Sequence, residues 1–85
     1  MKLTKIMNNF HALEWNDDII IYFSYETPVA LDVKGENYVA KNQWSKTTGK
    51  HINWYKQSVR ADYGKPKEVE HDELLFLIDM YVIHS

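Results

Sequence analysis

One run of seven residues constrains the fold of this chain more than any other feature of its sequence. Residues 19–25, Ile-Ile-Ile-Tyr-Phe-Ser-Tyr, are β-branched or aromatic at every position but one, which is typical of a β-strand. Polar turn residues precede the run at 16–18. Thr27-Pro28 interrupts the ladder after it, because proline has no backbone donor. The run lacks apolar–polar alternation, so we expect a central strand that is buried on both faces.

Strand-like segments flank this run on both sides. Residues 10–15 show imperfect strand patterning, and Val29, Leu31 and Val33 would share one face of the following strand. Residues 34–37 contain a glycine and have the length of a hairpin connection, with residues 38–41 as the return strand. The pattern predicts a three- or four-stranded antiparallel sheet over about residues 10–41.

The spacing of apolar residues changes after this sheet. Ile52, Tyr55 and Val59 recur at helical intervals and predict a helix over about residues 47–60. A hydroxyl oxygen just before a helix can accept from its free backbone donors. The candidates for this cap are Ser45, Thr47 and Thr48.

A second helix is predicted over about residues 71–83. Asp72 can cap it, and with Glu73 it places negative charge at the positive end of the helix dipole. A C-terminal strand over residues 80–84 is the alternative for the end of the chain. Together these segments predict a single α+β domain over residues 1–85.

The composition excludes several classes of protein. With 85 residues, 45% of them hydrophobic, the chain has room for one core and is too apolar for intrinsic disorder. No stretch approaches the roughly 18 apolar residues that span a bilayer, and the N-terminus lacks a signal peptide's apolar segment. We therefore expect a cytoplasmic protein that makes no membrane contact.

The sequence predicts neither a metal nor a cofactor. It contains no cysteine, and its histidines lack the spacing of metal ligands. These histidines are His11, His51, His71 and His84. Serine, histidine and aspartate follow no known motif of nucleophilic catalysis, so the chain is not expected to be an enzyme. A small hydrolase or transferase is the weakest alternative.

Charge is segregated along the chain. Residues 41–67 carry seven bases and one acid, whereas residues 68–85 carry five acids and no base. The first 40 residues are also acidic on balance. This arrangement predicts either a dipolar surface or ion pairs between the basic middle and its acidic flanks.

Two segments carry a resemblance to a known group of proteins. They are residues 22–30, Tyr-Phe-Ser-Tyr-Glu-Thr-Pro-Val-Ala, and residues 42–53, Asn-Gln-Trp-Ser-Lys-Thr-Thr-Gly-Lys-His-Ile-Asn. Together they resemble a family of small bacteriophage-encoded proteins of unknown function, although Phe23 and Trp44 depart from its usual pattern. The resemblance implies a phage or prophage origin and carries no known activity.

We expect a non-enzymatic, phage-type accessory protein that binds and modulates a host factor in the host cytoplasm. Host-defence inhibitors such as anti-CRISPR proteins are one such class, by analogy with phage accessory proteins in general. The expected partner is a host protein or protein complex. The alternative is a nucleic-acid-binding accessory protein that uses the basic, aromatic segment 41–67.

The segment from Trp44 to Trp54 is the candidate partner surface. It combines a helix start, lysines that oppose the helix dipole, and two large aromatic side chains. A purely structural explanation is a capped helix with solvated lysines and both tryptophans in the core. The predicted partner-binding residues are Trp44, Ser45, Lys46, Thr47, Thr48, Lys50, His51 and Trp54.

The last predicted helix offers more apolar surface than one core-facing stripe requires. Residues 74–83 contain apolar side chains on most of the helix circumference. We therefore expect self-association as a homodimer, with Leu77 and Met80 nearest the interface.

Overall fold

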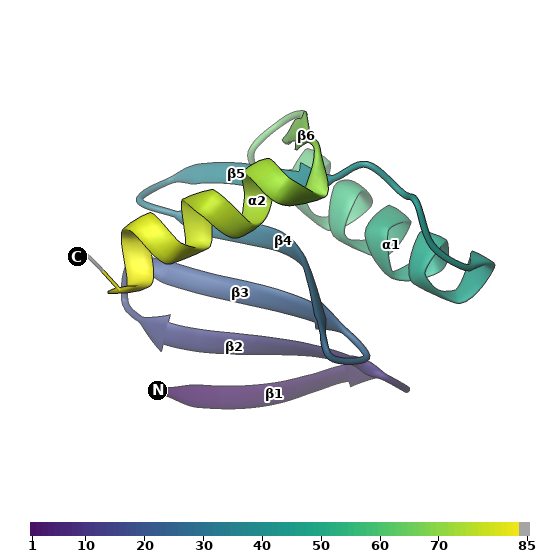
Figure 1. Cartoon of the computed structure of the whole chain (residues 1–85), viewed down its shortest axis with the longest axis horizontal. Coiled ribbons are helices and arrows are strands. Elements are labelled where there is room, and N and C mark those ends of the chain that lie inside the picture. The colour runs from purple at the N-terminus through teal and green to yellow at the C-terminus, as the bar shows by residue number, and fades with distance from the viewer. Residues whose placement is uncertain (84–85) are drawn as a thin grey trace.

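The computed structural model describes residues 1–83 and contains a six-stranded sheet. Its strands lie in the sheet in the order in which they occur in the chain (Figure 1). The strands are β1 (Lys2–Met7), β2 (Phe10–Asn16), β3 (Ile19–Ser24), β4 (Thr27–Val33), β5 (Glu36–Ala40) and β6 (Lys67–Val69). Neighbours from β1 to β5 are antiparallel, whereas β6 is parallel to β5. The predicted α+β class is confirmed.

The prediction of three or four antiparallel strands was an undercount. It missed β1, whose first four residues are all exposed and include Lys2 and Lys5. It also missed β6, which is only three residues long and gives too short a pattern to recognise. Because β6 is parallel to its neighbour, the sheet is mixed rather than purely antiparallel.

Helices cover the two faces of the sheet. Helix α1 (Lys46–Asp62) packs on one face, and α2 (His71–Ile78) continues into the π-helical segment η1 (Asp79–Ile83) on the other (Figure 1). Both helices lie close to their predicted positions. The alternative of a C-terminal strand is wrong for residues 80–83, and residue 84 lies outside the described residues. Within residues 1–83, no helix combines the length and apolar character that a membrane crossing requires.

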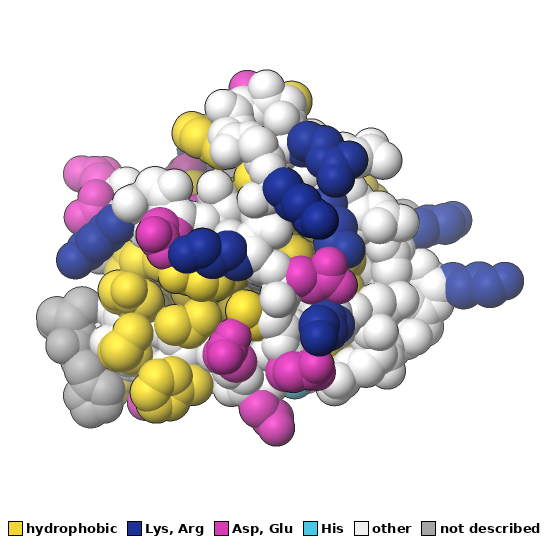
Figure 2. Space-filling view, turned by 90° about the horizontal axis from the view of Figure 1, so that it is seen from above, with side chains coloured by type: hydrophobic (Ala, Val, Ile, Leu, Met, Phe, Trp, Pro, Cys, Tyr) yellow, Lys and Arg dark blue, Asp and Glu magenta, His cyan; other side chains and the backbone are white. Residues whose placement is uncertain are grey.

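The surface reflects this two-sided arrangement. Seen from above, hydrophobic side chains gather in a patch at the lower left of the molecule (Figure 2). Lysine and arginine side chains are most numerous away from this patch, towards α1 (Figure 2). The molecule therefore presents a basic side and an apolar side.

A β-bulge in β4 changes the expected face pattern. Tyr22 pairs with Ala30 but the next residue of β3, Phe23, pairs with Pro28, so Val29 is an extra residue. Val29 consequently packs in the α1-side core, whereas Leu31 and Val33 pack on the α2 side. The prediction that all three share one face was wrong.

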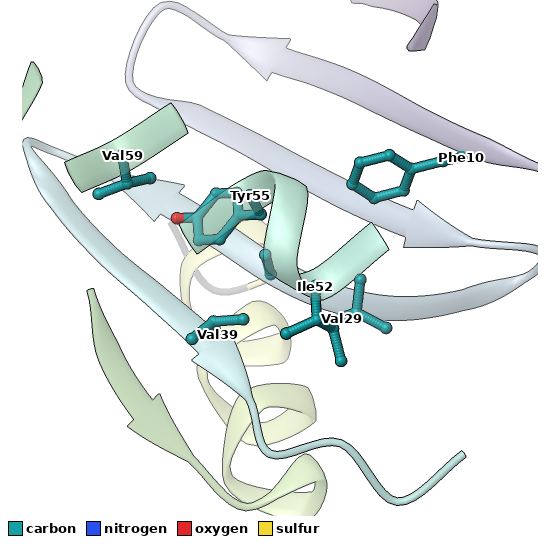
Figure 3. Packing of buried hydrophobic residues seen from close by; sticks show 7 residues of the cluster. Phe10, Val29, Val39, Ile52, Tyr55 and Val59 are labelled. Atoms are coloured by element: carbon teal, nitrogen blue, oxygen red, sulfur yellow. The ribbon is translucent and has the colours of Figure 1, made fainter. Parts of the chain in front are cut away.

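The α1-side core holds this helix firmly against the sheet. Ile52, Tyr55 and Val59 are buried, as their spacing predicted, and they pack against Phe10 and Val39 (Figure 3). The helix is thus attached over about two of its turns.

A partly buried carboxylate adds to this attachment. The Asp32 carboxylate accepts hydrogen bonds from the Tyr55 hydroxyl at 2.5 Å, the Asn37 amide at 2.7 Å and the Tyr22 hydroxyl at 2.9 Å. Burial, together with the Asp32 charge, raises the pKa of both tyrosines well above its ordinary value. The two hydroxyls therefore remain protonated donors across the physiological range.

The α2-side core is built differently. Leu74 is the only fully buried residue of α2, and it packs against sheet residues that include Ile21 and Leu31. Leu77 and Ile78 are only partly buried against the same cluster. Helix α2 is therefore attached by fewer buried side chains than α1.

Candidate functional site

The start of α1 confirms the predicted helix cap. The Ser45 hydroxyl accepts a hydrogen bond from the Thr48 backbone N–H at 3.3 Å. The preceding loop also packs tightly, since a Cβ atom on Gly49 would lie 2.9 Å from the Asn42 side-chain nitrogen. The same Asn42 side chain accepts from the Trp44 backbone N–H at 3.1 Å. The junction between β5 and α1 therefore has a defined conformation.

Two of the predicted partner-binding residues lie in the core. Thr48 and His51 are both buried, and each is hydrogen-bonded to Ser24, at 3.0 and 2.7 Å. The His51 ring also stacks on Phe10, with 4.7 Å between ring centroids. These contacts join the two segments on which the resemblance rests. Thr48 and His51 are thus placed to hold α1 on the sheet rather than to contact a partner.

Ser24 and His51 form a pair that the sequence analysis did not find. The 2.7 Å between Ser24 Oγ and His51 Nδ1 is within the reach of a nucleophile and its base. However, Ser24 is only 1% exposed. The other polar contact of the ring is a backbone hydrogen bond with Asn8 rather than a carboxylate. Burial lowers the pKa of His51, which favours the neutral ring expected of a core histidine.

Trp44 and Trp54 each pack partly against the core and are partly exposed. Trp44 is half-buried, contacts both hydrophobic clusters and meets the His71 ring edge-on at 4.8 Å. Trp54 is 36% exposed and meets the buried Phe10 ring edge-on at 5.6 Å. The structural explanation therefore accounts for part of each side chain, and Trp54 retains a surface that can contact a partner.

The outward side of α1 is lined by polar side chains that can donate hydrogen bonds. These residues are separated by alternating steps of four and three, so they follow one line along the helix. All five are exposed, and the line is about 21 Å long at 1.5 Å per residue. We call this line the donor stripe; its members are Lys46, Lys50, Asn53, Gln57 and Arg60.

The ion pairs between the basic residues 41–67 and the acidic flanks do not involve the charged residues of the donor stripe. Three bases of the basic middle pair with acids from its flanks, so the predicted ion pairs between these parts of the chain occur. The pairs are Lys41–Glu70 at 3.0 Å, Lys56–Glu68 at 3.3 Å and Lys67–Glu36 at 3.5 Å. Within residues 1–83, no ion pair involves Lys46, Lys50 or Arg60. Three of the four remaining bases of residues 41–67 therefore lie on α1, and the fourth is Lys65.

A hollow of about 160 Å³ on α1 is lined by Asn53, Lys56, Gln57 and Arg60, three of which belong to the donor stripe. A depression of about 560 Å³ is lined by Asn9, His11 and residues 25–27, and none of the eight predicted partner-binding residues borders it. Across residues 1–83, no cluster of His, Cys, Asp or Glu is arranged to hold a metal ion. His84 lies outside the described residues.

The predicted self-association residues are not the most exposed of their helix. Leu77 is partly buried against the α2-side cluster, and Met80 is 38% exposed. Phe76 and Ile83, at 65% and 68%, are more exposed than either. Self-association stays a prediction, and the apolar surface on which it rests is centred on different residues.

Comparison with known proteins identifies the family of this chain from its sequence. No curated protein and no solved structure matches it. A family model matches residues 1–73, which include the sheet, α1 and the start of α2. The match confirms the expected family of unknown function and gives no indication of a phage origin. The chain belongs to the family of unknown function DUF8033.

Proposed function

We propose that this chain is a non-enzymatic accessory protein that binds and modulates a host factor through the donor stripe and the adjoining Trp54. The supporting observation is the set of unpaired positive charges on α1. Lys46 and Lys50 also oppose the helix dipole, so they contribute nothing to the stability of the helix they occupy. An anionic partner surface would compensate for this local cost.

A host protein is the preferred partner. The chain carries a net charge of −2, so a long polyanion would be repelled by the acidic parts of its surface. An acidic patch on a protein is small enough to contact α1 alone. The resemblance to phage-encoded proteins is the only support for an anti-CRISPR-like defence inhibitor as the specific form of this function.

Nucleic-acid binding is the second candidate, and the side-chain types of the donor stripe are the observation that supports it. Lysine and arginine contact phosphates, whereas asparagine and glutamine can also hydrogen-bond base edges. Trp54 and Tyr63, which is 72% exposed, offer rings on which unpaired bases can stack. With three unpaired bases on the stripe, such binding would weaken with salt at a slope near −0.7 per phosphate contact for a single strand.

A charge-reversal experiment tests both candidates. The variant Lys46→Glu with Lys50→Glu is compared with Lys2→Glu with Lys5→Glu, which makes the same change in net charge on exposed residues of β1. Both are used as bait in host lysate, with and without nuclease, and the affinity for the captured partner is then measured. We expect the α1 variant to lose at least tenfold in affinity, or about 1.4 kcal/mol, and the β1 variant to bind like the parent.

The outcomes separate the partner classes. A stoichiometric host protein that survives nuclease and is lost only in the α1 variant supports the proposed function. Loss of every partner on nuclease treatment supports the nucleic-acid candidate instead. Equal affinity of the α1 variant and the parent at low salt excludes the donor stripe as the binding surface.

A further inference from the structure

A second exposed surface lies on the opposite side of the sheet, on α2 and η1. Phe76 of α2 is followed at steps of four and three residues by Met80 and Ile83 of the π-helical segment η1, and these three exposed residues form one line along the chain. Their exposed fractions are 65%, 38% and 68%. We call this line the apolar stripe. Solvation does not explain it, because three large apolar side chains next to one another are an unfavourable surface in water.

Acidic residues surround the apolar stripe. Asp72 and Glu73 are exposed and lie four and three residues before Phe76, on the same side of the helix. Asp79 lies between Phe76 and Ile83 in the chain. Residues 71–83 contain no lysine or arginine. The helical segment itself therefore combines exposed apolar residues with three acids and no base.

We infer that this face binds an amphipathic helical segment of a partner protein that carries lysine or arginine beside its own apolar residues. Only such a segment complements both features at once: its apolar side covers the stripe, and its basic side chains meet Asp72 and Glu73. The inference does not depend on the function proposed for α1.

A second copy of this chain fits the face less well. If two copies met through their apolar stripes, Asp72 and Glu73 of each copy would approach acids of the other across the interface. The donor stripe of a second copy would supply positive charge, but its five members include no apolar side chain. The homodimer expected from the sequence is therefore the competing occupant, and the test below distinguishes it.

The apolar stripe also lies outside the part of the chain that the family model matches. The family match ends at residue 73, so Phe76, Met80 and Ile83 lie beyond it, whereas the whole donor stripe lies within it. The two stripes are on helices that pack on opposite faces of the sheet. Both surfaces can thus be occupied at the same time, and the chain would then connect two partners.

The test uses a synthetic, fluorescein-labelled peptide of about 18 residues, which is five helical turns. It has leucine on one helical side and lysine on the other, and its control is a scrambled peptide with no helical sidedness. We expect fluorescence anisotropy to show binding of the amphipathic peptide alone. Phe76→Ser with Ile83→Ser should weaken it at least tenfold, whereas Tyr63→Ser, a matched change at an exposed aromatic on the α1 side, should not.

A charge-reversal variant keeps the inference testable if the serine variant does not fold. Asp72→Lys with Glu73→Lys leaves the apolar stripe intact. It should reduce binding of the lysine peptide at least tenfold and create binding of an analogue in which glutamate replaces every lysine. Circular dichroism confirms that each variant retains its helices.

Three results would overturn the inference. The first is equal binding of the amphipathic and scrambled peptides. The second is unchanged affinity in both the serine and the charge-reversal variants. The third is a dimer of the parent protein in sedimentation velocity that the serine variant abolishes, because a second copy would then be the occupant of the face.

Discussion

The two helices pack on the same sheet, yet they divide their residues between core and surface in opposite ways. Helix α1 buries five residues and begins with a side-chain cap, but its first turn contains no acid. Helix α2 buries only Leu74 and begins without a side-chain cap, but its first turn contains Asp72 and Glu73. Each helix therefore satisfies one rule of helix stability and violates another.

Each helix also carries exposed residues that neither its core nor its own stability explains. Lysines at the start of α1 and apolar side chains on the outside of α2 both reduce local stability or solubility without improving the core. Because the core does not need these residues, the comparison supports the two proposals made above, in which each outer face contacts a partner.

The largest expected contrast concerns truncation of one side chain on each helix. Ile52→Ala should lower the free energy of unfolding by about 2–5 kcal/mol, because it leaves a cavity between α1 and the sheet. Phe76→Ala should change it by no more than about 0.5 kcal/mol, because this ring faces solvent. Denaturant unfolding measures both values. A loss above about 2 kcal/mol for Phe76→Ala would show that the ring packs in the core.

The free energy of local opening should be lower for α2 and η1 than for α1. Helix α1 is attached by buried apolar residues and by the bonds to Asp32, whereas α2 and η1 have one fully buried residue. Native-state hydrogen exchange should therefore show the amides of α2 and η1 exchanging at least tenfold faster than those of α1, a difference of about 1.4 kcal/mol in opening free energy. Equal protection would mean that the partly buried side chains of α2 hold it as firmly.

A third contrast concerns pH and arises from His51. Its folded-state pKa lies below 6.5 because the ring is buried, whereas the unfolded chain has the ordinary value. Above pH 6.5 the ring is neutral in both states. As the pH falls below 6.5, the unfolded state gains a proton that the folded state resists, so the free energy of unfolding decreases.

A histidine variant checks this assignment. Unfolding measured between pH 7.5 and 5, a window on either side of the ordinary histidine pKa of about 6.5, should lose part of its pH dependence in His51→Gln. Identical pH profiles for the parent and His51→Gln would assign the effect to other groups.

The smallest expected contrast concerns the first turn of each helix. Lys46→Glu should raise the free energy of unfolding by about 0.3–1 kcal/mol, because it places an acid at the positive end of α1. Glu73→Lys should lower it by a similar amount in α2. Denaturant unfolding at low salt measures both changes. If Lys46→Glu destabilised the protein instead, Lys46 would have a stabilising role within the fold.

The sequence predicted those elements whose residue pattern lies within one short segment of the chain. The core face of α1 followed from the spacing of Ile52, Tyr55 and Val59, and its start followed from Ser45. The β1 strand could not be predicted in this way, because an edge strand with exposed residues has no buried face to produce a pattern. Val29 was assigned to the wrong face because a bulge depends on the pairing of β4 with β3, which a single strand does not reveal.

The candidate site was predicted only in part for a related reason. The donor stripe contains Lys46 and Lys50, which the sequence analysis selected, and three more residues that it did not. Thr48 and His51 were selected as surface residues, but their burial depends on Ser24, 27 positions before His51. A polar residue gives no sign in the sequence of whether a distant partner will satisfy it in the core.

The strand order described above also has a consequence during synthesis of the chain. From β1 to β5, each strand pairs with the one made immediately before it, so a growing chain can add strands as they leave the ribosome. Only β6 must wait, because its partner β5 is separated from it by the whole of α1. We therefore expect the parallel edge to form last, after α1 has docked, and until then β5 presents an open edge to other nascent chains.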